Sequence, residues 1–310
     1  MGSLFGNTSH RSGSTLRVPI SQVFREMGSL GTVRVIILIT CITFIAGPYR
    51  LTIAADSSAT GIDVAQEQYK TGKYAECLES TRKAIENGAY AAEWRALMIK
   101  SLMALGQYDK AADDMDIVLL HYPVSMRLLE LAHTVYLHNN QSGRANDAIN
   151  RLVRVGTSRD LRFMSPLDLV ALGNSLLLLG EEPKVILDEL FTRAIKNDPN
   201  CLDAYLAAGD LALAKQDYDL AANQYRDALK RFGKNPDAHF GLARAFYQSD
   251  RNQMIRSLDA AIYINPNHVS SLLLLAEHQI DCEDYAGAEK LLDKPRRRRD
   301  LRRWPEQSVW

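Results

Sequence analysis

Small and apolar residues recur at helical spacing along residues 203–230, DAYLAAGDLALAKQDYDLAANQYRDALK. The first stripe comprises Tyr205, Ala208, Gly209 and Ala212; the second follows a polar elbow at residues 215–217 and comprises Tyr218, Ala221, Tyr225 and Ala228. This spacing predicts two short helices joined by a turn. Each stripe is too narrow to form a core alone, so the pair is expected to pack against further copies of itself.

Copies of the pair occur along most of the chain. Tyr74 and Tyr108 begin similar segments 34 positions apart, and Tyr218 and Tyr285 begin two more. Pro123, Pro199 and Pro266 close repeats; the small pair of the first helix is kept in Leu172-Gly173 and Ala208-Gly209 and varied in Leu242-Ala243 and Leu275-Ala276. The period and these residues resemble the tetratricopeptide repeat family.

The resemblance implies an all-α fold: a right-handed α-solenoid of antiparallel helix pairs, with about six to seven repeats over residues 56–293. In this family the first helices of successive repeats line a concave groove that binds ligands. The groove-facing positions are expected to be Asp203, Leu206, Asp210, Leu213, Asp237, Phe240, Arg244, Tyr247, Leu273, Glu277 and Ile280. A competing interpretation is that the apolar members of this set only pack on neighbouring helices.

The groove set mixes apolar side chains with charges, a combination suited to an extended peptide or a partner helix. Some family members hold a terminal carboxylate with a Lys/Asn/Arg clamp. Here acids occupy the groove and Arg244 stands nearly alone among them, so that use is not expected. The tyrosines that open the second helices are expected to be packing residues rather than ligand contacts.

The N-terminal residues 1–55 differ from the repeats in composition. A Ser- and Gly-rich basic stretch precedes the apolar run Val33–Gly47, which is broken by one charge, Arg34. This order is typical of a cleaved export signal; the alternatives are an uncleaved N-terminal membrane anchor and a buried strand or helix. The expected location is therefore outside the cytoplasm, periplasmic or extracellular, or tethered to the membrane by Val33–Gly47.

The formal net charge of zero hides a strong asymmetry. Residues 1–55 carry net +4 and residues 294–310 carry net +5, so residues 56–293 carry net −9. An acidic solenoid is a poor nucleic-acid binder, because phosphate contacts need a basic surface. The expected partner is another protein or a peptide.

The repeat pattern stops near Lys294, where Pro295 is expected to break the last helix. The following segment, PRRRRDLRRWPEQSVW, has no helical periodicity. Three interpretations stay open for residues 294–310: a shifted reading frame or truncated gene product, a disordered basic tail, or a partner-binding arm.

The repeats contain no recognisable catalytic motif, cofactor motif or metal motif. Glu130 and His133 share a helix face, but one such pair is only part of a metal site. Cys77 takes a position held by alanine in other repeats, which favours a small core residue. The sequence predicts a non-enzymatic scaffold without cofactor. The alternative is the N-terminal part of a longer exported enzyme whose catalytic domain is missing.

Overall fold

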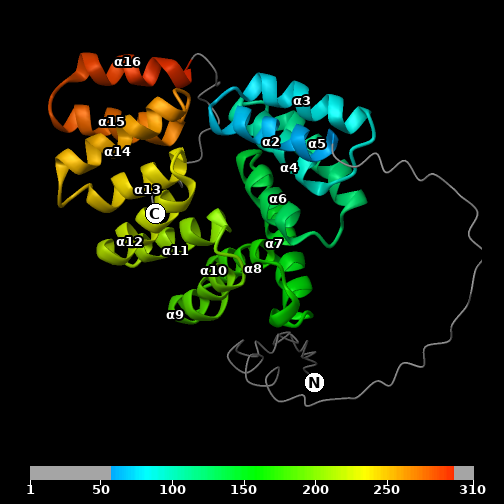
Figure 1. The fold of residues 1–310 in the computed structure, drawn as a ribbon. Coiled ribbons are helices and arrows are strands. Elements are labelled where there is room, and N and C mark those ends of the chain that lie inside the picture. Colours follow the sequence, from blue (N-terminus) through cyan, green and yellow to red (C-terminus); the bar gives the residue numbers. More distant parts are fainter. Residues whose placement is uncertain (1–56, 297–310) are drawn as a thin grey trace, which may run out of the picture. The chain divides into compact units, whose positions relative to one another are not determined.

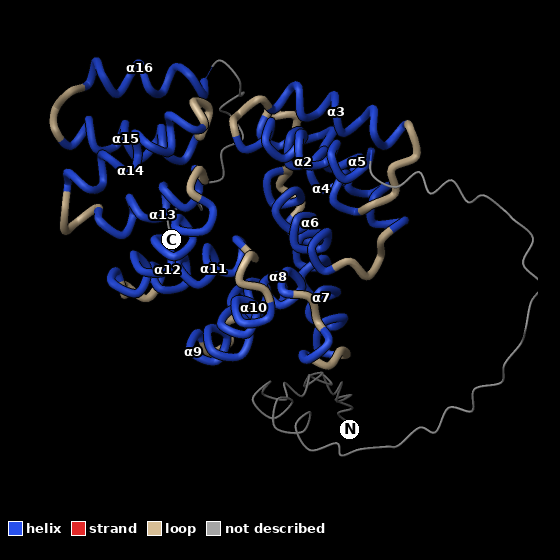
Figure 2. The backbone as a smooth tube through the Cα atoms, in the orientation of Figure 1, coloured by secondary structure: helices blue, strands red, loops and turns tan. Residues whose placement is uncertain are grey.

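The structure, a computed structural model, describes residues 57–296, and these form a row of seven helix pairs without a strand (Figures 1 and 2). The pairs are α2 (Ser57–Lys70) with α3 (Tyr74–Glu86), α4 (Ala92–Ala104) with α5 (Tyr108–His121), α6 (Met126–His138) with α7 (Ser142–Thr157), α8 (Pro166–Leu178) with the segmented helix α9 (Pro183–Ile186), η2 (Leu187–Phe191) and α10 (Thr192–Asn197), α11 (Leu202–Ala214) with α12 (Tyr218–Phe232), α13 (Pro236–Phe246) with α14 (Arg251–Ile264), and α15 (Val269–Asp281) with α16 (Tyr285–Arg296). A short 3₁₀ turn, η1 (Leu161–Phe163), precedes α8. The all-α solenoid expected from the repeats is confirmed.

The elbow between the two helices uses a left-handed residue in six of the seven described pairs, all but α13–α14. Gly72, Gly106 and Gly180 adopt φ of 79°, 74° and 85° at this position. In three other repeats the same place is taken by Asn140, Gln216 and Glu283, which have φ between 57° and 64°. Glycine adopts this conformation at no steric cost, whereas other residues do so only when the surrounding helices fix the turn.

Side-chain caps mark the starts of several helices. The Ser165 hydroxyl accepts a hydrogen bond from the Asp168 amide at 3.1 Å, and Pro166 occupies the first turn of α8. Asp217 and Asn235 cap α12 and α13 in the same way. Because these side chains satisfy amides that have no intrahelical partner, they fix where each helix begins.

Tyr225 of α12 occupies the centre of the best-formed repeat, where it is 1% exposed. Its ring lies between the small residues Gly209 of α11 and Gly241 of α13, where a Cβ on either glycine would overlap the ring. Its hydroxyl donates to the Asp210 carboxylate at 2.9 Å. The glycines thus create the space that lets three helices close around one aromatic ring.

The tyrosines at the start of the second helices have different surroundings. Tyr74 and Tyr108 are buried, which confirms their packing role. Tyr285, at the start of α16, is 65% exposed, so the same prediction is wrong there. In the fourth repeat a π-helical turn, η2, brings Phe191 against Gly173 of α8, where a Cβ would meet the ring.

The last helix extends slightly further than the sequence pattern predicts. α16 runs to Arg296, whereas the pattern places the end of the solenoid at 293. Proline interrupts a helix by removing one amide donor and crowding the preceding turn, a smaller penalty where the helix is ending anyway. Pro295 lies one residue from the end of α16.

Within residues 57–296, none of the helices has both the length and the apolar character needed to cross a bilayer. The proposed signal or anchor at Val33–Gly47 lies outside the described residues, as does the segment 297–310.

Candidate functional site

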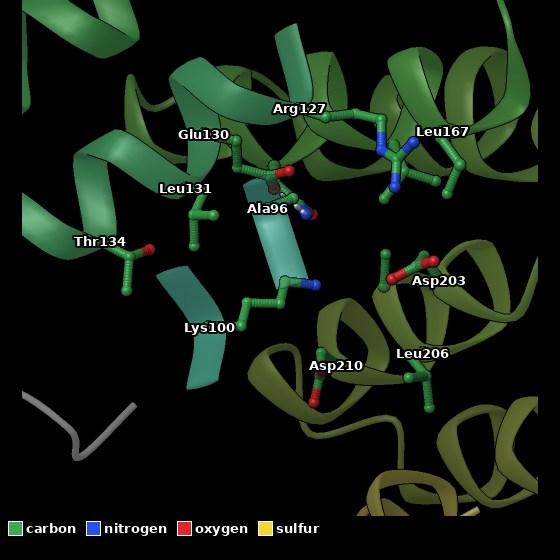
Figure 3. A pocket seen from close by; sticks show the side chains of 13 residues that line it. Ala96, Lys100, Arg127, Glu130, Leu131, Thr134, Leu167, Asp203, Leu206 and Asp210 are labelled. Atoms are coloured by element: carbon green, nitrogen blue, oxygen red, sulfur yellow. Dashed lines mark hydrogen bonds between the residues drawn. The ribbon is translucent and has the colours of Figure 1, made fainter. Parts of the chain in front are cut away.

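The first helices of successive repeats pack side by side along one face of the row. α4 contacts α6, α6 contacts α8, and α8 contacts α11, which in turn contacts α13. A cavity of about 360 Å³ opens on this face. Its lining comes from four first helices: Ala96 and Lys100 of α4; Arg127, Glu130, Leu131 and Thr134 of α6; Leu167, Val170 and Asn174 of α8; and Asp203, Leu206, Ala207 and Asp210 of α11 (Figure 3).

The cavity carries both signs of charge on facing helices. Arg127 pairs with Glu93 at 2.9 Å, and the Asn174 amide donates to Glu130 at 2.7 Å. Lys100 projects into the opening from α4, and Asp203 lies on the α11 side (Figure 3). Neither Lys100 nor Asp203 has a hydrogen bond or ion pair to another described residue. Both are therefore available to a ligand, with apolar contacts beside them from Leu167 and Leu206.

Two carboxylates of the cavity are partly removed from water. Burial raises the pKa of Glu130, and the nearby charge of Asp203 adds to the rise, while the Asn174 hydrogen bond opposes it. Burial likewise raises the pKa of Asp210, against the effect of its bonds from Tyr225 and Arg244. Desolvated carboxylates gain most from a new hydrogen-bond donor, so this face is prepared for polar contacts as well as apolar ones.

Replacing Glu130 with glutamine should remove a pH-dependent loss of stability. The folded-state pKa lies above the ordinary value of 4.5, so ionised Glu130 destabilises the native state as the pH rises through that window. Glutamine keeps an oxygen for Asn174 and does not ionise. The variant should therefore match the wild type below pH 4.5 and become the more stable protein towards neutral pH, as measured by urea unfolding across that range. A gap that is independent of pH would contradict this assignment.

The structure brings only part of the predicted groove set to this cavity. Asp203, Leu206 and Asp210 line it. Leu213 is 8% exposed and packs in a core cluster with Ala221 and Tyr225, so we leave it out of the site. This cluster also includes Leu242 and Ala245 of α13, and helical spacing alone did not separate the face that packs there from the face that lines the groove.

The remaining predicted groove positions continue along α13 and α15. Arg244 bridges to Asp210 at 3.0 Å and stacks near Phe240, and the Tyr247 hydroxyl donates to Asp281 at 3.0 Å. Asp237 is exposed and receives a contact from His268. Leu273 is half-buried, and Glu277 and Ile280 are exposed on α15.

Sequence reasoning missed the cavity residues of the second, third and fourth repeats. It placed Arg244 nearly alone among the cationic groups, whereas Lys100 and Arg127 reach the same face. One signal was available in the sequence. Charged pairs on neighbouring first helices are separated by one repeat length: Glu93 and Arg127 are 34 residues apart, and so are Asp210 and Arg244.

Sequence reasoning also missed a hydrogen-bonded Ser-His-Asp chain. His268 Nδ1 lies 2.7 Å from the Ser271 hydroxyl, and its Nε2 lies 3.0 Å from the Asp237 carboxylate. Ser271 is 0% exposed, so its hydroxyl cannot meet a substrate. The chain instead ties the start of α15 to α13.

The other candidate chemical groups have structural roles. Glu130 bonds Asn174, whereas His133 Nδ1 faces the carbonyl of Ala145, so the two do not converge. No group of three or more potential metal ligands gathers anywhere in 57–296. Cys77 is buried, as its alanine-like position predicts.

The sequence model of the tetratricopeptide repeat family matches residues 189–224 and 206–253. Among curated proteins, the formate-dependent nitrite reductase complex subunit NrfG of Escherichia coli O157:H7 is 27% identical over 104 residues, which are 32% of this chain and 52% of that protein. The chain thus spans about half the length of this relative.

Solved structures with a similar fold include that of the human IFIT1 dimer with m7Gppp-AAAA. It has a TM-score of 0.53 at 12% identity, over 77% of this chain and 58% of that one. A tetratricopeptide repeat protein from Parabacteroides merdae gives a TM-score of 0.48 at 12% identity, over 77% and 92% of the two chains. Residues 189–253 therefore match tetratricopeptide repeats, and the described chain has the α-solenoid fold of which such repeats are built.

Proposed function

We propose that this protein is a non-enzymatic scaffold that binds an extended peptide or a partner helix along its first helices. The observation that carries the proposal is the 360 Å³ cavity, whose walls come from four successive repeats. An extended ligand crossing several repeats gains contacts from each of them, as peptide-binding grooves require. The similarity to a subunit of an enzyme complex agrees with a role in protein assembly.

The cavity and the positions on α13 and α15 supply different parts of the expected interface. Leu206 and Leu167 offer apolar contacts, while Lys100 and Asp203 offer charges that form no hydrogen bond or ion pair within residues 57–296. Phe240 and Tyr247 extend the same face with aromatic side chains that are half-buried. Rigid aromatic anchors give contact area, and the charges fix the orientation of the bound segment.

We propose that the scaffold acts outside the cytoplasm or at the membrane. The apolar run Val33–Gly47 supports export from the cytoplasm or attachment to the membrane, with the solenoid presented on the outer side. A scaffold in either position would meet its partner after export.

The groove assignment can be tested with a peptide selected by the full-length protein from a phage-displayed random library. Leu206→Ala, Phe240→Ala and Tyr247→Ala should each weaken the selected peptide by about tenfold or more, because truncated anchor residues cost on the order of 1–2 kcal/mol. Fluorescence anisotropy of the labelled peptide measures the affinities. Circular dichroism checks that each variant keeps its helices.

Tyr263→Ala is the matched control, because Tyr263 of α14 is 89% exposed and absent from the predicted groove set. It should leave the affinity unchanged. Equal binding by all four variants, loss of binding only in Tyr263→Ala, or a library that yields no binder would reject the groove.

A further inference from the structure

Two turns that are almost two hundred residues apart touch each other. One is the elbow between α2 and α3 in the first repeat, and the other is the turn between α14 and α15. The amide of Asn265 donates to the Tyr74 hydroxyl at 3.0 Å, and the amide of Asn267 donates to the Gly72 carbonyl at 3.0 Å. In a solenoid each repeat normally contacts only its neighbours, so a bond between the first and the sixth to seventh repeats calls for a separate explanation.

A local hydrogen bond orients the side chain of Asn265 towards Tyr74. It is 3% exposed, and its oxygen accepts the backbone amide of Asn267 at 2.9 Å. That local bond leaves the amide nitrogen directed at Tyr74. The equivalent turn between α10 and α11 makes the same local bond with an aspartate, from the Asn200 amide to Asp198 at 2.8 Å. The turn itself therefore needs only the oxygen, and the nitrogen of Asn265 serves the long-range contact.

The opposing elbow approaches closely enough to exclude a side chain. A Cβ on Gly72 would overlap the Asn265 side chain and would lie 3.2 Å from the Cβ of Asn267. Gly180 forms the same left-handed elbow in the fourth repeat, and a Cβ there would meet nothing within 4 Å. The close approach is thus a property of this contact and not of the elbow in general.

We propose that the hydrogen bonds from Asn265 to Tyr74 and from Asn267 to Gly72 form a clasp. This clasp closes the row of repeats and controls access to the concave face. Two neutral hydrogen bonds favour the closed form by about one to two orders of magnitude, so the clasp holds at rest and still opens thermally. A large molecule reaches the cavity on the first helices only from the open form. The inference does not depend on peptide binding, because closure is a property of the free chain.

The closure is measured as a distance between spin labels at Glu79 of α3 and Asp259 of α14, both exposed, in a Cys41→Ser/Cys282→Ser background that leaves the buried cysteines in place. The wild-type chain should give one narrow distance distribution by double electron-electron resonance. Tyr74→Phe, which keeps the ring and removes the hydroxyl that accepts from Asn265, should broaden and lengthen it, and so should Gly72→Ala.

Gly180→Ala is the matched control, since it imposes the same backbone strain without the overlap, and it should keep the narrow distribution. Tyr74→Phe keeps the test decisive if Gly72→Ala proves poorly folded. A distribution that is already broad in the wild type, or one that is unchanged in Tyr74→Phe, would overturn the clasp.

Control of access has its own readout that needs no partner. In the same background, a thiol introduced by Leu206→Cys lies in the cavity, and its rates of modification by N-ethylmaleimide and by a polyethylene-glycol maleimide can be compared. Adding Tyr74→Phe should raise the rate with the large reagent by roughly tenfold and leave the small reagent unaffected. Equal effects on both reagents, or no effect on either, would mean that the clasp does not control access.

Discussion

Tyr225→Ala should destabilise the protein by about 3–5 kcal/mol, the range found when a large buried aromatic is removed. Tyr225 is 1% exposed between two glycines on different helices, so its loss leaves a void that neither helix can fill with a side chain of its own. Asp210 also loses one of its two hydrogen-bond donors. Urea unfolding followed by circular dichroism measures the change.

Tyr225→Phe separates the contribution of ring packing from that of the hydrogen bond to Asp210. It keeps the ring and removes only the hydroxyl, which should cost about 1.5–3 kcal/mol because the lost bond is to a charged group. Arg244 still pairs with Asp210, which limits the loss. If phenylalanine is as damaging as alanine, the hydrogen bond and not the packing of the ring dominates; a cost below about 1 kcal/mol for alanine would contradict the packing argument altogether.

Much of the solenoid could be predicted from residue spacing, because the interactions that form each helix pair lie within one or two repeats. Apolar positions at helical spacing, capping residues such as Ser165, and the tyrosines that begin second helices each act within one or two repeats. The family resemblance converted those local signals into an arrangement of helix pairs. The residue-by-residue prediction was wrong where the surroundings of a repeat differ, as at Tyr285, which is 65% exposed.

Only part of the candidate site could be predicted from the sequence, because the packing between neighbouring repeats decides which side chains line it. Which face of a first helix turns towards the groove depends on the packing angle of its neighbours, so helical spacing did not show that Leu213 packs in a core cluster with Ala221 and Tyr225. Lys100, Arg127 and Glu130 lie on α4 and α6, where no groove position was predicted from the sequence, and they line one cavity with residues of α11. The bond from Asn265 to Tyr74 spans 191 residues, a separation at which local spacing carries no information.

Gly241→Ala should destabilise the protein by about 1–3 kcal/mol, although alanine normally favours a helix over glycine by about 1 kcal/mol. The new Cβ would overlap the Tyr225 ring, which Gly209 of α11 confines from the other side, where a Cβ would lie 2.6 Å from the ring. Neither the ring nor the two helix backbones can move away without opening the core. Urea unfolding of the purified variant gives the free-energy change.

Gly143→Ala on α7 is the matched substitution, because a Cβ there meets nothing within 4 Å. It should be neutral or stabilising by up to about 1 kcal/mol, from the smaller loss of backbone entropy on folding. Combining Gly241→Ala with Tyr225→Ala supplies the decisive comparison, since without the ring the added methyl has no obstacle and its cost should fall to nearly zero. If Gly241→Ala costs the same in both backgrounds, the glycine serves the backbone of α13 and not the space for Tyr225.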